Sequence, residues 1–323
     1  KSLDRLFVRF MAELPAKPIP SASLAPVIPF SLTSLCRVVK ELGVTLIHAH
    51  DSLATTIAIG VKRKTGLPVV LSRRIASPVR HNIFSRRKYS AEKLDAVLAI
   101  SETVKAVFAK SGYPADRIFV VPSGIDTRAL QDITRDEDFR SDFGGKYLVG
   151  GIGKLSHKKN WQLMVQTAAR IAKTDMDVHW CLAGDGPEAR KLRVMADELG
   201  VASRFHFLGF RTDANRILKS VDVLFFPSLM EGASVAVRTA MILGTPVIAV
   251  DAPGTMESLG GNGWAIRPDD LDGAVRSVVE ALTDTAKRDG IARAARELAV
   301  NRFAFERTIE GTIGVYERIA GGL

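Results

Sequence analysis

The residues best suited to bind a ligand are Glu231 and Gly232, which come directly before a predicted helix. The Glu231 carboxylate can accept hydrogen bonds from sugar hydroxyls, and Gly232 has no Cβ to keep a ligand off the backbone. Free amides at the start of the helix favour a phosphate. We therefore predict a binding site for a phosphorylated sugar at Glu231 and the amides of Ala233, Ser234 and Val235.

A second candidate phosphate-binding turn is GIGKLSHKKN, from Gly151 to Asn160. Gly153 lets a phosphate approach the backbone, and Lys154 and Lys159 can hold a diphosphate from two sides. The spacing fits neither a Walker A loop nor a dinucleotide-binding fingerprint. Gly184 belongs to a third turn of this kind. Each turn alone would also suit an ordinary loop between a strand and a helix.

Cysteine and aspartate patterns point away from metal chemistry. The chain has 2 cysteines, Cys36 and Cys181, both among apolar residues, which suits buried thiols in a reducing cytoplasm. Asp175 and Asp177 form an Asp-x-Asp pair, but the pair precedes its predicted strand and therefore reads as a solvated turn.

The charge is uneven. Residues 52–91 contain no acidic residue and nine basic ones, in a chain of formal charge +10. Such a block attracts a phosphorylated substrate, an anionic membrane or nucleic acid, or it is simply a solvated basic surface. We do not expect nucleic acid as a partner, because only Phe84 and Tyr89 interleave with the charges. No apolar run approaches the ~20 residues that span a bilayer, and no secretory signal is visible, so we expect a cytoplasmic protein.

Predicted strands and helices alternate along the chain, as in α/β proteins. Strands are predicted at 44–47, 68–71, 96–100, 147–152, 179–183, 205–208, 221–226 and 247–250. Helices are predicted at 32–42, 53–64, 102–110, 161–173, 187–199, 213–220 and 303–319, with a charged linker at 132–142 and a turn at 254–257. We expect two domains, 1–142 and 143–302, and a C-terminal helix, 303–323, that packs back on the first. Ligands in parallel sheets lie beyond the carboxyl ends of the strands, where the turns above fall.

The order and spacing of these turns resemble the retaining glycosyltransferases of the GT-B fold, in the group 1 family, also called family 4. Ile47–His50, Ala99–Ser101 and Val121–Asp126 resemble motifs of the family's first domain. In the second, the similar pieces are Gly153-Lys154-Leu155 with Lys159, Leu182–Pro187, Phe207–Gly209 and Pro227–Ala249.

The resemblance implies two Rossmann-like parallel-sheet domains facing each other across a cleft, with a nucleotide sugar on the second, UDP-sugars being favoured. Its diphosphate would contact Lys154 and Lys159, Gly153 and Gly184 would lie beside it, and Glu231 would hold the sugar. Glu257 would be a further nucleotide contact. Transfer would proceed with retention of configuration, the leaving diphosphate helping to deprotonate the acceptor, and no metal or other cofactor is expected.

The chain departs from the family at Thr239, where a second glutamate normally binds the ribose. A hydroxyl in its place would weaken donor binding by ~1–3 kcal/mol. Lys154 replaces an arginine and keeps the charge without its planar fork. The family's strand and glycine loop at the start are missing, so we expect the chain to lack its native beginning.

On the acceptor side, the expected histidine after strand 68–71 is absent. His50 is therefore the predicted catalytic histidine, and the other acceptor-side candidates are Arg73, Arg74, Arg80 and His81. The expected acceptor is a glycan or glycolipid of the cell surface, and an anionic membrane on the inner face of the plasma membrane is a further expected partner. Two alternatives stay open: a catalytically silent protein that binds a nucleotide or glycan, and a sugar-nucleotide epimerase.

Overall fold

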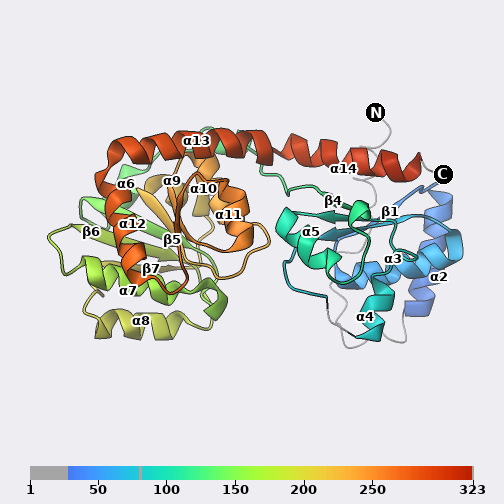
Figure 1. The fold of residues 1–323 in the computed structure, drawn as a ribbon, viewed down its shortest axis with the longest axis horizontal. Helices are drawn as coiled ribbons and strands as arrows, with labels where there is room; N and C mark the ends of the chain where they lie inside the picture. The colour runs from blue at the N-terminus through green and yellow to red at the C-terminus, as the bar shows by residue number, and fades with distance from the viewer. Residues whose placement is uncertain (1–27, 80–81, 322–323) are drawn as a thin grey trace.

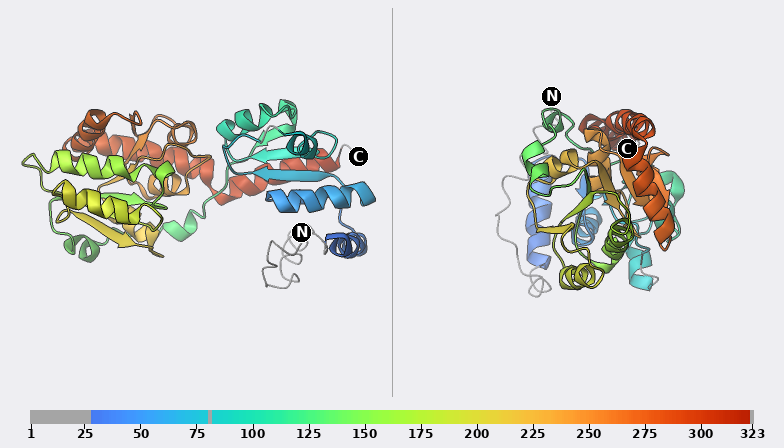
Figure 2. Two further views of the ribbon diagram at one scale, coloured as in Figure 1. Left: turned by 90° about the horizontal axis from the view of Figure 1, so that it is seen from below. Right: turned by 90° about the vertical axis from the view of Figure 1, so that its left-hand side faces the viewer.

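A computed structural model describes residues 28–79 and 82–321 of the chain. The expected features of residues 1–27, and the candidates Arg80 and His81, lie outside these ranges. Two lobes lie end to end and a long helical segment joins them along one side (Figures 1 and 2). We call them the N-terminal lobe, built on a sheet of four strands, and the C-terminal lobe, built on a sheet of six.

The N-terminal lobe has a parallel sheet in the order β1-β2-β3-β4. Its elements are α2 (Ile28–Glu41), β1 (Ile47–Ala49), α3 (Ser52–Thr65), β2 (Val69–Arg73), α4 (Ile83–Lys88), β3 (Ala96–Ala99), α5 (Glu102–Ala109), the 3-10 turn η2 (Ala115–Arg117) and β4 (Ile118–Val120). Side chains cap the helices: Asp51 accepts from Ala54 N at 2.7 Å, and Ser101 accepts from Val104 N at 3.1 Å. Each loop after a strand therefore runs from the end of the buried strand to the cap of the next helix.

The C-terminal lobe has a parallel sheet in the order β10-β9-β8-β5-β6-β7. Its strands are β5 (Tyr147–Ile152), β6 (Val178–Ala183), β7 (Phe205–Gly209), β8 (Val223–Phe226), β9 (Val247–Val250) and β10 (Trp264–Ile266). Its helices and 3-10 turns are η3 (Arg128–Leu130), α6 (Glu137–Ser141), η4 (His157–Lys159), α7 (Trp161–Ile171), α8 (Ala189–Glu198), α9 (Ala214–Ser220), α10 (Val235–Leu243), α11 (Pro253–Leu259), α12 (Leu271–Thr283) and α13 (Thr285–Phe303). The central strands are apolar runs buried on both faces, which is why the sequence pattern identified them.

Several elements differ from the sequence-based expectation. Strand β1 begins at Ile47, three residues after the predicted start, so His48 lies within the strand and not in the loop that follows it. Arg73 is the last residue of β2 and does not follow it. The charged segment 132–142 is not a free linker, because it contains α6, whose Arg140 pairs with Asp222 at 3.1 Å. Gly254 lies within helix α11, where a turn was predicted.

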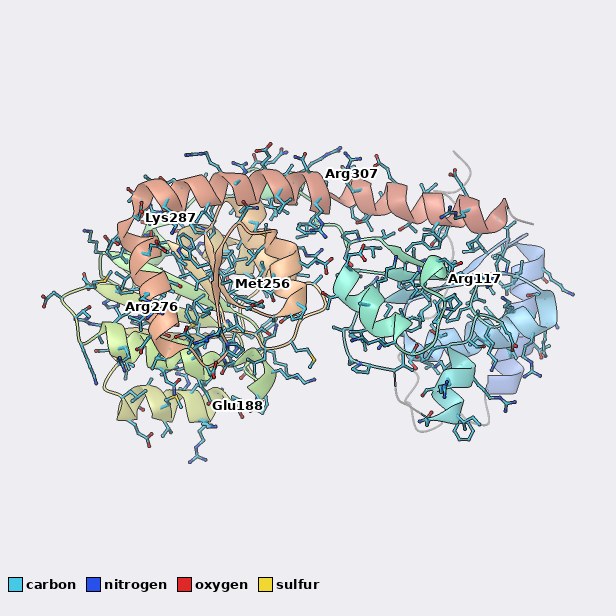
Figure 3. The ribbon with its side chains drawn as sticks, in the orientation of Figure 1. Arg117, Glu188, Met256, Arg276, Lys287 and Arg307 are labelled. Carbon is cyan, nitrogen blue, oxygen red and sulfur yellow. The ribbon has the colours of Figure 1, made fainter. Side chains whose placement is uncertain are left out.

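The C-terminal helix is interrupted at Ala304. Helix α13 ends at Phe303 on the C-terminal lobe and α14 (Phe305–Ala320) packs through Val315 on the sheet of the N-terminal lobe. Figure 3 labels Lys287 on α13 and Arg307 on α14, along the same side of the molecule. No helix in the described ranges is long and apolar enough to cross a bilayer.

The two connections between the lobes touch each other. Ile125 N donates to Phe303 O at 2.8 Å, and Phe305 N donates to Ile125 O at 3.1 Å. A Cβ at Gly124 would lie 2.5 Å from Phe305 Cα, so the crossing requires glycine there. The buried guanidinium of Arg238 donates to Ser123 O and lies 5.1 Å from the Phe303 ring centroid. These contacts help to set the relative position of the lobes.

His48 holds α14 to the end of the N-terminal sheet. Its Nδ1 lies 2.5 Å from the Tyr316 hydroxyl and its Nε2 lies 2.9 Å from Ser72 Oγ. Burial, then the charges of His50 and Arg74, lower the pKa of His48 to about 3. The neutral ring is thus the form that the folded protein accommodates.

We expect the protein to lose stability on acidification through His48. An unfolded chain protonates this ring near pH 6.5, whereas the folded one does so near pH 3. The unfolded state then binds more protons in this window, so the free energy of unfolding falls as the pH drops, by about 3 kcal/mol at pH 4 from this group. Urea unfolding at several pH values measures the slope. His48→Gln, which keeps polar groups but cannot titrate, should flatten it; an unchanged slope would contradict this role.

Candidate active site

The strand order places a crevice at the end of the C-terminal sheet. From β5 the chain adds β6 and β7 on one side, and β8, β9 and β10 on the other. Strands β5 and β8 are neighbours, paired through Val149 and Val223. Their connections leave in opposite directions, and at such a switch point the loops at the carboxyl ends of the strands are expected to border a ligand-binding crevice. The loops are residues 153–160, after β5, and residues 227–234, after β8.

Lys159 and Glu231 meet in this crevice, one from each loop. The Lys159 ammonium donates to Glu231 Oε1, which also accepts from Ser228 Oγ at 2.7 Å. Lys159 Nζ lies 4.9 Å from the ring centroid of Phe226. The side chain of Lys159 is 23% exposed and that of Glu231 is 14% exposed, so both are accessible to a ligand while their charges neutralise each other.

Local backbone conformation aims Lys159 at the crevice. The chain leaves β5, forms the 3-10 turn η4, and reverses at Asn160, whose φ is 52°. Asparagine tolerates this left-handed conformation better than most residues. Leu229 N donates to Lys158 O at 2.9 Å, which ties the two loops together. Lys154 lies earlier in the loop with an exposed side chain that has no ion pair among the described residues, so its charge is available to an anion.

Glycines in these loops allow backbone segments to touch. A Cβ at Gly184 would lie 1.9 Å from Gly153 O, and a Cβ at Gly254 would lie 2.3 Å from Glu231 O. At Gly232 the nearest atom would be Arg74 O of the other lobe, at 2.8 Å. At Gly184 and at Gly232 the backbone of another segment lies where a Cβ would be, and the contact of both residues with a donor stays a prediction. A Cβ at Gly153 would meet only side chains.

Helix α10 begins at the crevice. Ser234 caps it, accepting from Val237 N at 3.4 Å, while Val235 is exposed. The remaining first-turn amides, including that of Val235, have no intrahelical acceptor. Thr239 lies one turn further along α10 with 4% of its surface exposed. Its contact with a ribose stays a prediction, as do the amide contacts of Ala233 and Ser234.

The N-terminal lobe brings two of its predicted residues to the same place. Arg74 O approaches Gly232, and Ser101 Oγ donates to Gly232 O at 2.7 Å. Arg74 Nη2 lies 3.4 Å from His50 Nδ1. Desolvation of the ring, then the charge of Arg74, lower the pKa of His50 while Asp51 opposes them. A neutral His50 therefore accepts from Arg74 at Nδ1 and leaves its Nε2–H as a donor.

Arg73 is placed differently from the expectation for an acceptor contact. Its guanidinium turns into its own lobe, where Nη2 donates to Ser77 O at 2.5 Å and Cζ lies 5.7 Å from the Phe108 ring centroid. Its Nε is buried without a partner among the described residues. Arg73 thus supports the loop after β2 that carries Arg74.

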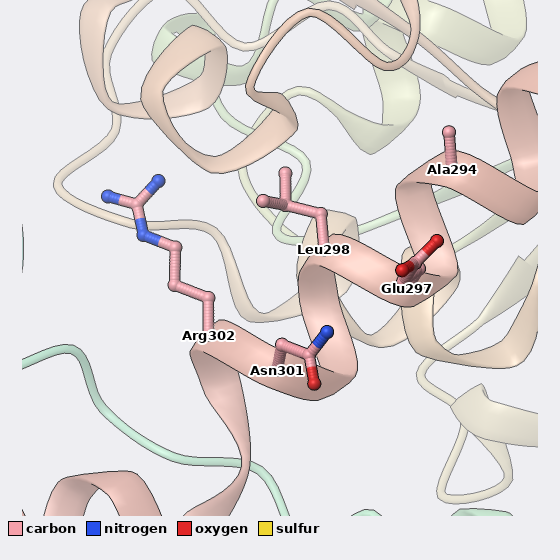
Figure 4. A pocket seen from close by; sticks show the side chains of 5 residues that line it. All are labelled: Ala294, Glu297, Leu298, Asn301 and Arg302. Carbon is pink, nitrogen blue, oxygen red and sulfur yellow. The ribbon is translucent and has the colours of Figure 1, made fainter.

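Glu257 joins the lobes in this structure. Its carboxylate accepts from Glu102 N at 2.7 Å and from Thr103 N at 3.0 Å, at the start of α5. Arg302 Nη2 donates to it at 3.2 Å from α13. Figure 4 shows Arg302 beside a surface depression on α13, whose lining comprises Ala294, Glu297, Leu298, Asn301 and Arg302. The predicted nucleotide contact of Glu257 would require these bonds to open.

Sequence reasoning missed two residues of this region. Ser228 is fully buried and donates to the Glu231 carboxylate. The sequence feature that could have identified it is the Pro-Ser pair directly after β8. Arg238, 1% exposed, is a lone charge in the otherwise apolar VAVRTAMIL run of α10, a pattern that marks a buried cation. In the described ranges no group of three or more metal-ligating side chains occurs.

Two parallel-sheet lobes, the second with a switch point between β5 and β8, are the architecture of the GT-B glycosyltransferase fold. The structure of Anabaena Alr3699/HepE in complex with UDP and glucose matches with a TM-score of 0.78 and 23% identity, over 94% of this chain and 84% of that one. This likeness establishes the fold.

Family models settle the family. "Glycosyltransferase Family 4" matches residues 3–129, and "Glycosyl transferases group 1" matches residues 146–284. The chain belongs to the group 1, family 4 glycosyltransferases.

Curated relatives are distant. The 2-deoxystreptamine glucosyltransferase of Streptomyces kanamyceticus is 27% identical over 244 residues, which are 72% of this chain and 63% of that protein. The match therefore spans less than two thirds of that relative's length. The UDP-Gal:alpha-D-GlcNAc-diphosphoundecaprenol alpha-1,3-galactosyltransferase of Escherichia coli is 23% identical over 304 residues, 88% of this chain and 78% of that protein.

Proposed function

We propose that this protein transfers a sugar, with retention of configuration, from a nucleoside diphosphate sugar to a hydroxyl of a cell-surface glycan or lipid-linked acceptor. The observation that carries the proposal is the meeting of Lys159 and Glu231 at the switch point, opposite Arg74 and His50 of the other lobe. UDP is the favoured nucleotide. The names of the E. coli relative, with its UDP-sugar and lipid diphosphate, and of the UDP complex with a related fold support both choices.

In the proposed reaction the acceptor oxygen bonds to the anomeric carbon as the bond from that carbon to the diphosphate oxygen breaks. The acceptor proton passes to the departing diphosphate on the same face, so no protein nucleophile is required. Negative charge grows on the diphosphate during this step. Lys154, Lys159 and the first amides of α10 would stabilise that charge, the kind of preorganised electrostatic effect that often dominates catalysis.

Glu231 and His50 would position the two substrates. When a diphosphate draws Lys159 away, the Glu231 carboxylate keeps Ser228 as a donor and gains capacity for sugar hydroxyls. Arg74 can only donate, so a neutral His50 accepts from it at Nδ1 and carries its proton on Nε2, which would donate to an oxygen of the acceptor. The mechanism uses no metal or other cofactor, and it would operate in the cytoplasm, where nucleotide sugars are the donors.

Thr239 favours a second candidate, a catalytically silent protein that binds a nucleotide or glycan. A hydroxyl with 4% exposure offers the ribose one uncharged hydrogen bond at most. The Lys159–Glu231 pair supports the transferase instead, because it places a cation where the charge of a departing diphosphate would develop.

Nucleotide binding and turnover separate the candidates. We expect UDP to raise the melting temperature of the purified protein more than GDP, ADP or CMP do, because it would bind the native state. A transferase then turns over UDP-sugars faster with a glycolipid extract than without it, a silent protein binds without turnover, and an epimerase converts the donor without any acceptor. Absence of stabilisation by every nucleotide would rule the proposal out.

Restoring the family's glutamate extends this test to residue 239. Thr239→Glu is expected to tighten UDP binding about 5- to 100-fold by adding a charge-assisted hydrogen bond. Thr239→Gln is the matched control, because it has the same length without the charge and should gain less. Equal or weaker binding by Thr239→Glu, measured by calorimetry on folded protein, would remove residue 239 from the ribose site.

A further inference from the structure

Helix α4 presents apolar side chains to solvent. Phe84 is 82% exposed and Ile83 is 67% exposed, and no large apolar side chain in the described ranges is more exposed than Phe84. The helix projects from the edge of the N-terminal lobe in Figure 1. The two residues are neighbours in the sequence, so they form a small apolar patch together and not a single exposed side chain.

Cations accompany the pair on the same short helix. Arg86 and Arg87 are exposed, follow Ile83 by three and four residues, and form no ion pair with any described residue. Positions three and four apart share a helix face. Lys88 donates to Ser52 Oγ at 2.8 Å and so fixes α4 against the start of α3. Residues 52–91 contain no acidic side chain, so no acid within this segment neutralises the charge.

We propose that α4 docks on an anionic bilayer, with Phe84 and Ile83 in the interface and Arg86 and Arg87 on lipid phosphates. Apolar side chains flanked by cations match the two layers of a membrane surface, acyl boundary and headgroups. Nucleic acid fits less well, because the second aromatic, Tyr89, packs edge-on against Phe108 with ring centroids 5.7 Å apart. Stacking on bases needs a free ring.

The surface lies on the chain segment that follows Arg74, the residue that touches the donor loop at Gly232. The inference deepens the proposed function in one respect, since a lipid-linked acceptor would reach the crevice from the same membrane. Vesicle binding can nevertheless be measured without donor or acceptor, so the two proposals fail independently.

Vesicle flotation of the full chain tests the docking surface. We expect binding to phosphatidylcholine vesicles that contain about one third phosphatidylglycerol, and little binding to phosphatidylcholine alone. The double variant Ile83→Ser, Phe84→Ser should weaken binding at least about tenfold, because it removes the apolar contact. Arg86→Gln with Arg87→Gln should weaken it about thirtyfold at low salt.

Two control variants remove cations or an exposed apolar side chain at sites outside α4. Arg63→Gln with Lys64→Gln removes two exposed cations near the far end of α3, and Phe210→Ser removes a side chain that is 79% exposed on the C-terminal lobe. Both should bind anionic vesicles as the unchanged protein does, and UDP should stabilise all variants equally. Equal loss in the controls, no binding at all, or a dimer in size-exclusion chromatography that the Phe84 variant abolishes would overturn the proposal.

Discussion

Replacing Lys159 with methionine is expected to lower kcat/KM for the donor about 10²- to 10³-fold. The change removes a cation from the place where diphosphate charge develops, and the loss of one preorganised donor to a developing anion has effects of this size. Methionine keeps the apolar stem against Phe226, so folding should be preserved. Steady-state assays with the UDP-sugar and a glycolipid acceptor measure the effect.

Lys158→Met is the matched control for this prediction. Lys158 is exposed, adjacent in sequence, and contributes only its carbonyl, which accepts from Leu229 N at 2.9 Å. Its loss should change kcat/KM less than about threefold, since an exposed charge acts weakly in water. Equal rates in the two variants would exclude Lys159 from the site.

Glu231→Gln examines the other half of the pair. The amide keeps the shape and can still contact Ser228, but it leaves the Lys159 ammonium without its counter-ion. If Glu231 binds sugar hydroxyls, we expect turnover to fall as in Lys159→Met, while free UDP, which has no sugar, binds at least as tightly as before. A variant that loses UDP affinity and turnover in parallel would instead indicate a structural role for Glu231.

Sequence patterns identified the central strands and the chemical residues but not how the residues meet. Strands β5 and β9 were predicted to the residue, because a strand buried on both faces is an uninterrupted apolar run. The contact between Lys159 and Glu231 joins residues 72 positions apart and exists only because β5 and β8 pair. That pairing is a property of the sheet order, which no local pattern contains.

The missed elements depend on distant partners in the same way. Helix α6 has Phe139 as its one buried side chain, and it is held by the pair between Arg140 and Asp222, so its own sequence is too polar to indicate a helix. The resemblance to the family implied that Glu257 contacts the nucleotide, yet in the structure its carboxylate accepts from the first amides of α5 in the other lobe. The family pattern marks such a position without specifying which partner it meets.

Gly184→Ala is expected to destabilise the C-terminal lobe by at least about 2–4 kcal/mol. The residue has a φ of 149°, and the new Cβ would lie 1.9 Å from Gly153 O, a backbone atom that cannot move without shifting the loop after β5. The same shift would displace Lys154, so UDP should no longer raise the melting temperature. Calorimetry with and without UDP measures both effects.

Gly200→Ala is the control that separates the steric overlap of a new Cβ from the strain of a positive φ. Gly200 is in the same lobe and also has a positive φ, 71°, but a Cβ there would meet nothing within 4 Å. It should cost only the left-handed penalty of ~1–2 kcal/mol and leave the response to UDP intact. If Gly184→Ala is no less stable than Gly200→Ala, the loops after β5 and β6 do not touch as described. The larger loss, together with the lost response, would show that glycine at 184 brings these two loops together and thereby positions Lys154.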